Sequence, residues 1–177
     1  MLTWQQYLEK HGTSYDYSSV QVDIPQHLAK KIIAWGKKHI PEKELYKEGS
    51  HFGRENEIHV TILYGLHTSK SEEVKEIVKG NAIKFTLGKI SIFEHDAKYD
   101  VVKIEVQGQS LHQLNKKLKQ LKHTSSFPTY CPHVTLAYVK KGQGKKYIGI
   151  NEFSGEIIAA KEIIFSSKDD TKVKIKL

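Results

Sequence analysis

The chain has 177 residues, of which 38% are hydrophobic and 27% are charged, a composition typical of a globular protein with one core. Its single cysteine, Cys131, excludes an internal disulfide and a metal cluster held by thiolates. No apolar run approaches the roughly 20 residues that span a bilayer, and the N-terminal residues lack the basic start and apolar centre of a secretory signal. We therefore expect a cytoplasmic protein with no membrane partner.

The charge favours polyanionic ligands. Lys and Arg number 28 against 20 Asp and Glu, which gives a formal charge of +8, and such an excess attracts nucleotides and nucleic acids. Arg54 is the only arginine in this lysine-rich chain. Its planar fork can bind phosphate through two parallel hydrogen bonds, so Arg54 is a candidate substrate-binding residue, with an ordinary surface arginine as the alternative.

Hydrophobic spacing predicts alternating strands and helices in the first half. A short helix is expected over residues 2–11, and residues 18–24 alternate apolar and polar side chains as a half-buried strand does. Leu28, Ile32 and Trp35 define the apolar face of a helix over 25–40. A polar loop then leads to a strand over 58–64.

The next predicted helix, over residues 71–79, is expected to start with Ser71 as its cap. A strand follows over 83–93, with a weak point at Gly88. The second half continues in the same way: strand 101–106, helix 110–121, strand 133–139, and three C-terminal strands over 157–160, 163–166 and 173–177.

This order predicts an α+β fold built mostly from antiparallel sheet with helices on the outside. No linker rich in Pro, Gly or Ser separates the two halves. We therefore expect one domain over 1–177 made of two packed lobes, approximately 18–80 and 81–177, preceded by the helix over 2–11.

A short internal repeat carries the chemistry. Residues 59–64 read HVTILY and residues 133–138 read HVTLAY, so they match at His, Val, Thr and Tyr. Each copy lies on a predicted strand, and the strand period of two places His and Thr on one face. The same period places Tyr64 and Tyr138 on the opposite face, where core packing is the expected role.

Two imidazoles facing one cleft suit displacement at phosphorus. His59 and His133 would act as base and acid, in an order that the sequence leaves open, because a pKa of about 6.5 gives both protonation states near neutral pH. The hydroxyls of Thr61 and Thr135 would donate hydrogen bonds to the non-bridging oxygens. This chemistry needs no metal or other cofactor. A zinc site is the competing interpretation, but neither H-E-x-x-H nor a Cys/His spacing is present.

The paired H-x-T motifs resemble the 2H phosphoesterase superfamily, also called LigT-like. The resemblance covers about residues 18–177 and implies two pseudo-symmetric lobes around a central cleft, with His59, Thr61, His133 and Thr135 as the catalytic residues. The family includes RNA 2′,3′-cyclic phosphodiesterases, 2′-5′ oligoadenylate phosphodiesterases and phage anti-CBASS nucleases that destroy cyclic oligonucleotide signals. The sequence context of residues 53–58 and 65–68 is similar to that of phage and bacterial members.

Two further residues are candidate substrate-binding groups. Tyr130 precedes His133 by three positions and could stack on a nucleobase, and Lys140 starts a lysine-rich loop that could attract phosphate. The resemblance favours a small cyclic nucleotide or cyclic oligonucleotide as substrate, in a host cytoplasm if the gene is viral. Two alternatives stay open: an RNA-end enzyme that binds longer RNA, and a non-catalytic module that sequesters nucleotides. The sequence does not fix the oligomeric state.

Overall fold

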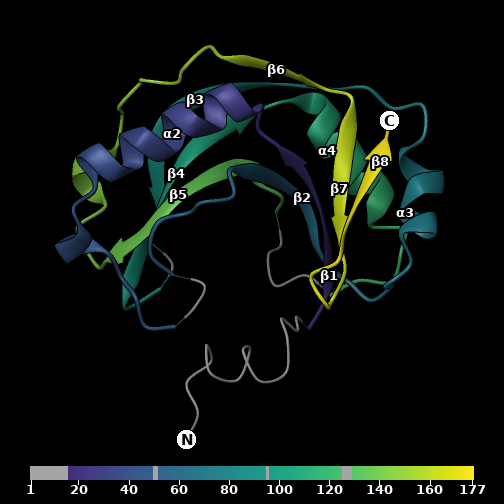
Figure 1. The fold of residues 1–177 in the computed structure, drawn as a ribbon, viewed down its shortest axis with the longest axis horizontal. Helices are drawn as coiled ribbons and strands as arrows, with labels where there is room; N and C mark the ends of the chain where they lie inside the picture. Colours follow the sequence, from purple (N-terminus) through teal and green to yellow (C-terminus); the bar gives the residue numbers. More distant parts are fainter. Residues whose placement is uncertain (1–15, 50–51, 95, 125–128) are drawn as a thin grey trace, which may run out of the picture.

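The computed structural model describes residues 16–49, 52–94, 96–124 and 129–177. Its strands form one curled antiparallel sheet in the order β6-β3-β4-β5-β2-β1-β7-β8 (Figure 1). The strands are β1 (Ser18–Asp23), β2 (His59–Leu66), β3 (Ile83–Phe93), β4 (Tyr99–Gln107), β5 (His133–Lys140), β6 (Ile157–Ala160), β7 (Glu162–Ser166) and β8 (Lys172–Lys176). The predicted α+β class and antiparallel pairing are confirmed, and the predicted helix over 2–11 lies outside the described residues.

Three α-helices lie outside the curl of the sheet (Figure 1). They are α2 (Gln26–His39), α3 (Ser71–Val78) and α4 (Gln109–Leu118), and two short 3-10 turns occupy Glu42–Glu44 and Lys145–Tyr147. Each helix buries the apolar stripe that its spacing predicts. The predicted cap of α3 is wrong, because Ser71 is the first helical residue and Lys70 stands at the cap position without a side-chain hydrogen bond. No helix in the described part of the chain is long and apolar enough to cross a membrane.

Helix α2 covers the half of the sheet that does not contain the strand before it, and α4 spans the two halves. Helix α2 follows β1 in the chain but packs against β5, whereas α4 follows β4 and packs against β2 and β3. Leu111, Leu114 and Leu118 of α4 are almost completely buried, and burial of each such side chain contributes roughly 1.5–3 kcal/mol. The hydrophobic core therefore lies between the helices and the convex face of the sheet, which leaves the concave face for the site.

The sheet divides the chain at positions different from the expected boundary at residue 80. Strand β7 hydrogen-bonds to β1, with Val20 opposite Phe165, and β8 pairs with β7. The C-terminal strands therefore complete the half that contains β1 and β2, while β3, β4, β5 and β6 form the other half. This pairing joins the two ends of the described chain, and no local pattern in the sequence encodes it.

Candidate active site

The two H-x-T motifs lie side by side at the centre of the sheet. Strands β2 and β5 are antiparallel neighbours through one residue pair, Val60 opposite Val134, and both valines are fully buried. Since side chains alternate along a strand, the residues on either side of each valine point to the concave face. His59, Thr61, His133 and Thr135 are half-buried there. Diagonal positions in such a pair lie roughly 7–8 Å apart, within reach of long side chains.

Both imidazoles are anchored in the same way. The Nδ1–H of His59 donates to the carbonyl oxygen of Glu57 at 2.6 Å, and that of His133 donates to the carbonyl of Cys131 at 2.8 Å. A carbonyl only accepts hydrogen bonds, so each contact assigns the proton to Nδ1. The Nε2 atom of each ring is consequently the one that takes up or gives a proton.

A β-bulge follows the threonine of each motif. On β2, adjacent Val20 and Gln21 of β1 lie opposite Leu63 and Thr61, which leaves Ile62 as the extra residue. On β5, adjacent Val102 and Lys103 of β4 lie opposite Ala137 and Thr135, which leaves Leu136 as the extra residue. Both bulges therefore put two consecutive apolar residues into the core and reverse the alternation after them. The repeat thus includes the bulge.

The bulges correct the prediction for Tyr64 and Tyr138. Uninterrupted alternation would place them opposite the histidines, but both tyrosines line the same recess as His59. Tyr64 is 49% exposed, so it is not a core residue. Burial raises the pKa of Tyr138, and the charges of Glu55 and Tyr99 add to that shift, so the Tyr138 hydroxyl stays neutral near physiological pH.

The segments that lead into the motifs are held crosswise. Beyond the Val60–Val134 pair, residues 53–55 run beside β5, where Tyr138 N–H donates to the Gly53 carbonyl at 2.8 Å and Glu55 N–H donates to the Leu136 carbonyl at 2.9 Å. Residues 122–124 run beside β2 in the corresponding way, and Thr124 N–H donates to the Gly65 carbonyl at 2.8 Å. Each motif is thereby fixed to the other half of the sheet.

The pseudo-symmetry extends to the outer neighbours of the motif strands. On β1, Gln21 lies opposite Thr61 and Asp23 opposite His59. On β4, Lys103 lies opposite Thr135 and Glu105 opposite His133. The two carboxylates are exposed, whereas Gln21 and Lys103 are each only 8% exposed. A neutral amide on one side therefore corresponds to a buried ammonium on the other.

His133 lies in a less polar environment than its partner. Burial lowers the pKa of His133, the bond to the Cys131 carbonyl opposes that shift, and the positive charges of Lys103 and His59 lower the pKa further. The ring of Phe93 contacts His133 edge to face, with 4.9 Å between centroids. The Val60–Val134 pair places the two imidazoles on neighbouring strands.

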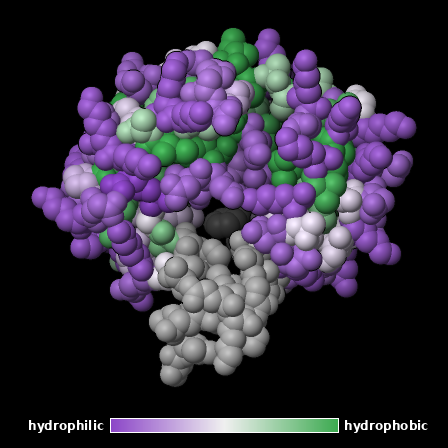
Figure 2. Space-filling view, viewed as in Figure 1, coloured by the Kyte–Doolittle hydropathy of each residue, from purple (hydrophilic) through white to green (hydrophobic). Residues whose placement is uncertain are grey.

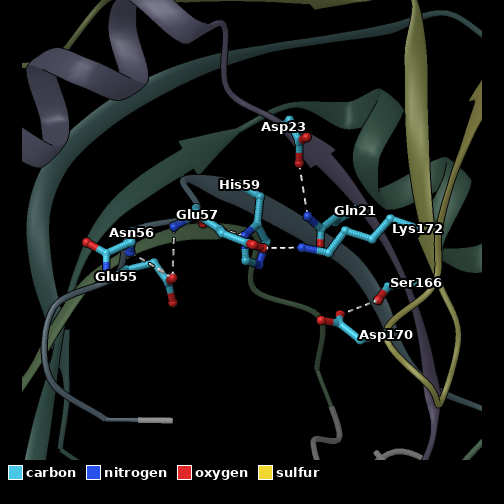
Figure 3. A network of polar contacts seen from close by, with 9 residues as sticks. All are labelled: Gln21, Asp23, Glu55, Asn56, Glu57, His59, Ser166, Asp170 and Lys172. Atoms are coloured by element: carbon cyan, nitrogen blue, oxygen red, sulfur yellow. Dashed lines mark hydrogen bonds and ion pairs between the residues drawn. The ribbon is translucent and has the colours of Figure 1, made fainter. Parts of the chain in front are cut away.

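A recess of about 560 Å³ opens beside the motifs. Figure 2 shows a dark hollow near the centre of this face, bordered above by hydrophilic side chains. Figure 3 shows His59 between Glu55, Asn56 and Glu57 on one side and Gln21, Lys172, Ser166 and Asp170 on the other. Thr61 also lines the recess, and His133 and Thr135 adjoin it across the β2–β5 pair.

Aromatic side chains stand at both ends of this recess. At the β1–β2 end, Tyr17 contacts Tyr64 edge to face at 5.9 Å between centroids and stacks on His67 at 5.3 Å. At the β5 end, Phe52 contacts Tyr138 edge to face at 5.1 Å. His59 and Thr61 thus line the same recess as both aromatic groups.

Arg54 is placed at the rim of the recess, but its guanidinium is used within the protein. Its Nε donates to the Gly36 carbonyl at 3.3 Å, its other nitrogens donate to the Ile40 carbonyl and to Glu42, and the last contact is an ion pair. These carbonyls belong to the end of α2, where a cation satisfies unpaired acceptors. Arg54 therefore fixes the loop to the helix, and its binding of phosphate stays a prediction.

The other two predicted substrate residues also have different positions. Tyr130 is packed against the core, and its hydroxyl donates to the Thr61 carbonyl at 2.9 Å, so it holds a motif strand, and its stacking on a base stays a prediction. Burial raises its pKa, which keeps the hydroxyl protonated for that bond. Lys140 is exposed at the end of β5 and does not line the recess.

Sequence reasoning missed Gln21, Lys103, Asp170 and Lys172, because their places beside the motifs depend on strand register. One signal was present: residues 20–23 (VQVD) and 102–105 (VKIE) share a pattern of apolar, long polar, apolar and acidic residues. Within the described ranges, no three His, Cys, Asp or Glu side chains are grouped in a way that would hold a metal ion.

Comparison with known proteins agrees with this geometry. The family model described as anti-CBASS protein Acb1 matches residues 19–174. The chain belongs to the Acb1 family. The family is described as anti-CBASS, which agrees with the resemblance to phage anti-CBASS members. No curated protein matches this chain.

Solved structures resemble the Acb1-family chain in fold. A phosphoesterase crystal structure has a TM-score of 0.62 at 17% identity, and Escherichia coli LigT complexed with 3′-AMP has a TM-score of 0.62 at 16% identity. Each alignment covers 91% of this chain and 94% of the other. Kluyveromyces marxianus Usb1 with uridine monophosphate has a TM-score of 0.55 at 7% identity, covering 92% and 98%. The LigT-like fold that the resemblance implied is confirmed.

Proposed function

We propose that this protein hydrolyses a phosphodiester bond in a small cyclic oligonucleotide signal and so inactivates the signal. The observation that carries the proposal is the pair of Nδ1-anchored imidazoles with a threonine beside each, next to a recess that both aromatic groups line. A viral gene for such an enzyme would serve evasion of cyclic-nucleotide immunity.

The reaction follows from the two Nε2 atoms. One imidazole removes a proton from the attacking water as its oxygen bonds to phosphorus, and the other gives a proton to the ribose oxygen as its bond to phosphorus breaks. Thr61 and Thr135 donate hydrogen bonds to the non-bridging oxygens, whose charge grows in the transition state. After turnover one histidine has gained a proton and the other has lost one, and solvent exchange restores both.

The recess suits a ligand with more than one base. Its volume lies within the roughly 300–1,000 Å³ typical of small-ligand sites. Tyr17 and Tyr64 at one end and Phe52 and Tyr138 at the other offer stacking surfaces, each worth about 1–3 kcal/mol per base. A phosphodiester between two stacked bases would then lie over the histidines.

Long RNA suits the surface less well. The lysine-rich loop after β5 is matched by acidic groups, since Lys141 pairs with Asp100, Lys145 with Glu94 and Lys146 with Glu44. Binding to long RNA depends on unpaired cations that replace counterions along the backbone. An enzyme that binds long RNA would need a row of unpaired cations, and these ion pairs reduce the number of unpaired lysines in the loop.

The test is product analysis by chromatography after incubation with excess EDTA. The substrates are 2′,3′-cyclic mononucleotides, 2′-5′ oligoadenylate, and cyclic dinucleotides and trinucleotides with 3′,3′ and 2′,3′ linkages. We expect cleavage of cyclic oligonucleotides that is lost in His59→Ala and in His133→Ala and kept in His27→Ala, a control at an exposed histidine on α2.

Two results would change the assignment. Cleavage confined to 2′,3′-cyclic mononucleotides or 2′-5′ linkages would identify an RNA-end enzyme. Binding of cyclic oligonucleotides without turnover, even with divalent metal restored, would identify a sequestering module, and in that case the alanine variants would retain the ligand.

A further inference from the structure

The buried residue beside each motif threonine distinguishes the two otherwise equivalent halves of the site. Gln21 and Lys103 occupy matching register positions and are equally buried. The Gln21 side-chain amide donates to Asp23 Oδ1 at 2.9 Å, and Lys172, the ammonium drawn beside His59, is paired with Glu57 (Figure 3). Lys103 brings a full positive charge into the corresponding place.

Burial lowers the pKa of Lys103, the charge of Glu105 opposes that shift, and two contacts hold the ammonium on the side of His133. Its ammonium donates to Ser91 Oγ at 2.6 Å and lies 4.3 Å from the centroid of the Phe93 ring, where the face of an aromatic ring attracts a cation. The same ring contacts His133. Lys103, Phe93 and His133 thus form a continuous row on the second half of the site.

Other charges near the histidines do not reproduce this difference. In the described part of the chain, the titratable groups on the segments packed against His133 are His59 from β2, Lys103 and Glu105 from β4, and Cys131. Glu105 lies opposite His133 just as Asp23 lies opposite His59, and both carboxylates are exposed. Water screens exposed charges more strongly than buried ones, so these two nearly cancel in the comparison. The charge of the buried Lys103 ammonium is therefore the difference that remains between the two halves of the site.

We infer that Lys103 is a positioning residue that sets the roles of the two histidines: it keeps His133 neutral as the base, and His59, beside neutral Gln21, is the acid. The assignment of His133 as the base rests on the proposed function, whereas the effect of Lys103 on the pKa of His133 does not. In the reaction, His133 Nε2 takes the proton of the attacking water, and His59 Nε2–H protonates the leaving ribose oxygen.

The experiment is an NMR titration of the imidazole Cε1–H signals without substrate. Removal of the charge in Lys103→Gln, which copies the Gln21 side, is expected to raise the pKa of His133 by about half to one unit, the size expected for a charge at this range in a partly buried site. Lys103→Met, which keeps an unbranched chain over Phe93, gives the same shift. Lys103→Arg keeps the charge and leaves the pKa of His133 near its original value.

Two further variants complete the test. Gln21→Lys is expected to lower the pKa of His59 by a similar amount, so the double variant Gln21→Lys/Lys103→Gln exchanges the order of the two pKa values. Lys116→Gln, at an exposed lysine on α4, makes the same charge change away from the site and should shift neither histidine.

Activity then assigns the roles. In Lys103→Gln, the acid limb of the kcat/KM profile moves to higher pH together with the pKa of His133, since a base must be unprotonated to act. An unchanged His133 pKa in this variant, or an equal shift in Lys103→Arg, overturns the electrostatic role. A shift of the alkaline limb instead overturns the assignment of His133 as base. Absence of all turnover overturns the proposed function and the role assignment, while the titration still judges the effect of Lys103.

Discussion

The two halves of the active site have nearly the same backbone and different chemistry around it. Each half offers a strand with His, Thr and Tyr on the concave face, a bulge after the Thr, and a carbonyl that holds imidazole Nδ1. Their neighbours differ: Gln21 against Lys103, and an open recess beside His59 against the Phe93 ring on His133. The repeated sequence supplies two matching His-x-Thr units, and residues outside the repeat give them unequal surroundings.

Replacement of one imidazole at a time tests whether both halves are needed. His59→Ala and His133→Ala should each lower kcat by about 10²- to 10⁴-fold, the contribution typical of a general acid or base, because neither histidine can perform both proton transfers at once. Turnover of a cyclic oligonucleotide measures the loss, with His27→Ala as control. Full activity in either variant would contradict the two-histidine mechanism.

The threonines test whether the halves share the stabilisation of charge. Thr61→Val and Thr135→Val keep the side-chain shape and remove one hydroxyl donor each, and kcat should fall by about 10²-fold in both. The same assay, with KM measured alongside, separates this loss from weaker binding. A fall of kcat in only one of the variants would show that a threonine from one half of the site stabilises the charge on the phosphate.

The tyrosines after the bulges test whether both ends bind a base. Tyr64→Leu and Tyr138→Leu should each raise KM by about tenfold with a smaller change in kcat, since stacking contributes about 1–3 kcal/mol per base. Tyr64→Phe and Tyr138→Phe retain the ring and are the matched controls. If the Phe variants lose as much as the Leu variants, the hydroxyls and not the rings make the contact.

The carbonyl of the extra residue in each bulge accepts a hydrogen bond from a different kind of donor, so the two bulges can be compared by their contribution to stability. Asn115 of α4 donates to the Ile62 carbonyl at 2.7 Å, whereas a backbone N–H, that of Glu55, supports the Leu136 carbonyl. Asn115→Leu should lower the free energy of unfolding by about 1–3 kcal/mol, because a buried carbonyl loses its partner. Urea denaturation measures this, with the exposed Gln113→Leu as control; equal stability of both variants would mean that the bond contributes nothing net.

The sequence predicted those features that depend on local pattern. Alternation located the strands, helical spacing located α2 and α4, and the repeat located His59 and His133. It failed at Tyr64 and Tyr138, since a period of two holds only until a bulge adds a residue. The sequence of one strand does not reveal a bulge, because a bulge is defined by the register between two paired strands.

Register and long-range pairing also explain the other differences. Lys103 lies beside Thr135 because of how β4 pairs with β5, and β7 joins β1 across most of the described chain. Arg54 was expected to bind phosphate from its residue type alone, but the end of α2 and Glu42 are closer acceptors. The catalytic roles of His59 and His133 stay predictions that rest on the repeat.

Strands β2 and β5, which carry the two motifs, are joined by the single residue pair Val60–Val134. On either side of it the strands diverge, and each is bonded to a segment that belongs to the other motif. A small displacement of β2 along β5 at this pair would change the alignment of the two Nε2 atoms before it disturbed the hydrophobic core of either half. The relative position of the two imidazoles thus depends on this single pair, and we expect a ligand that spans it to slow hydrogen exchange at the amides beside it first.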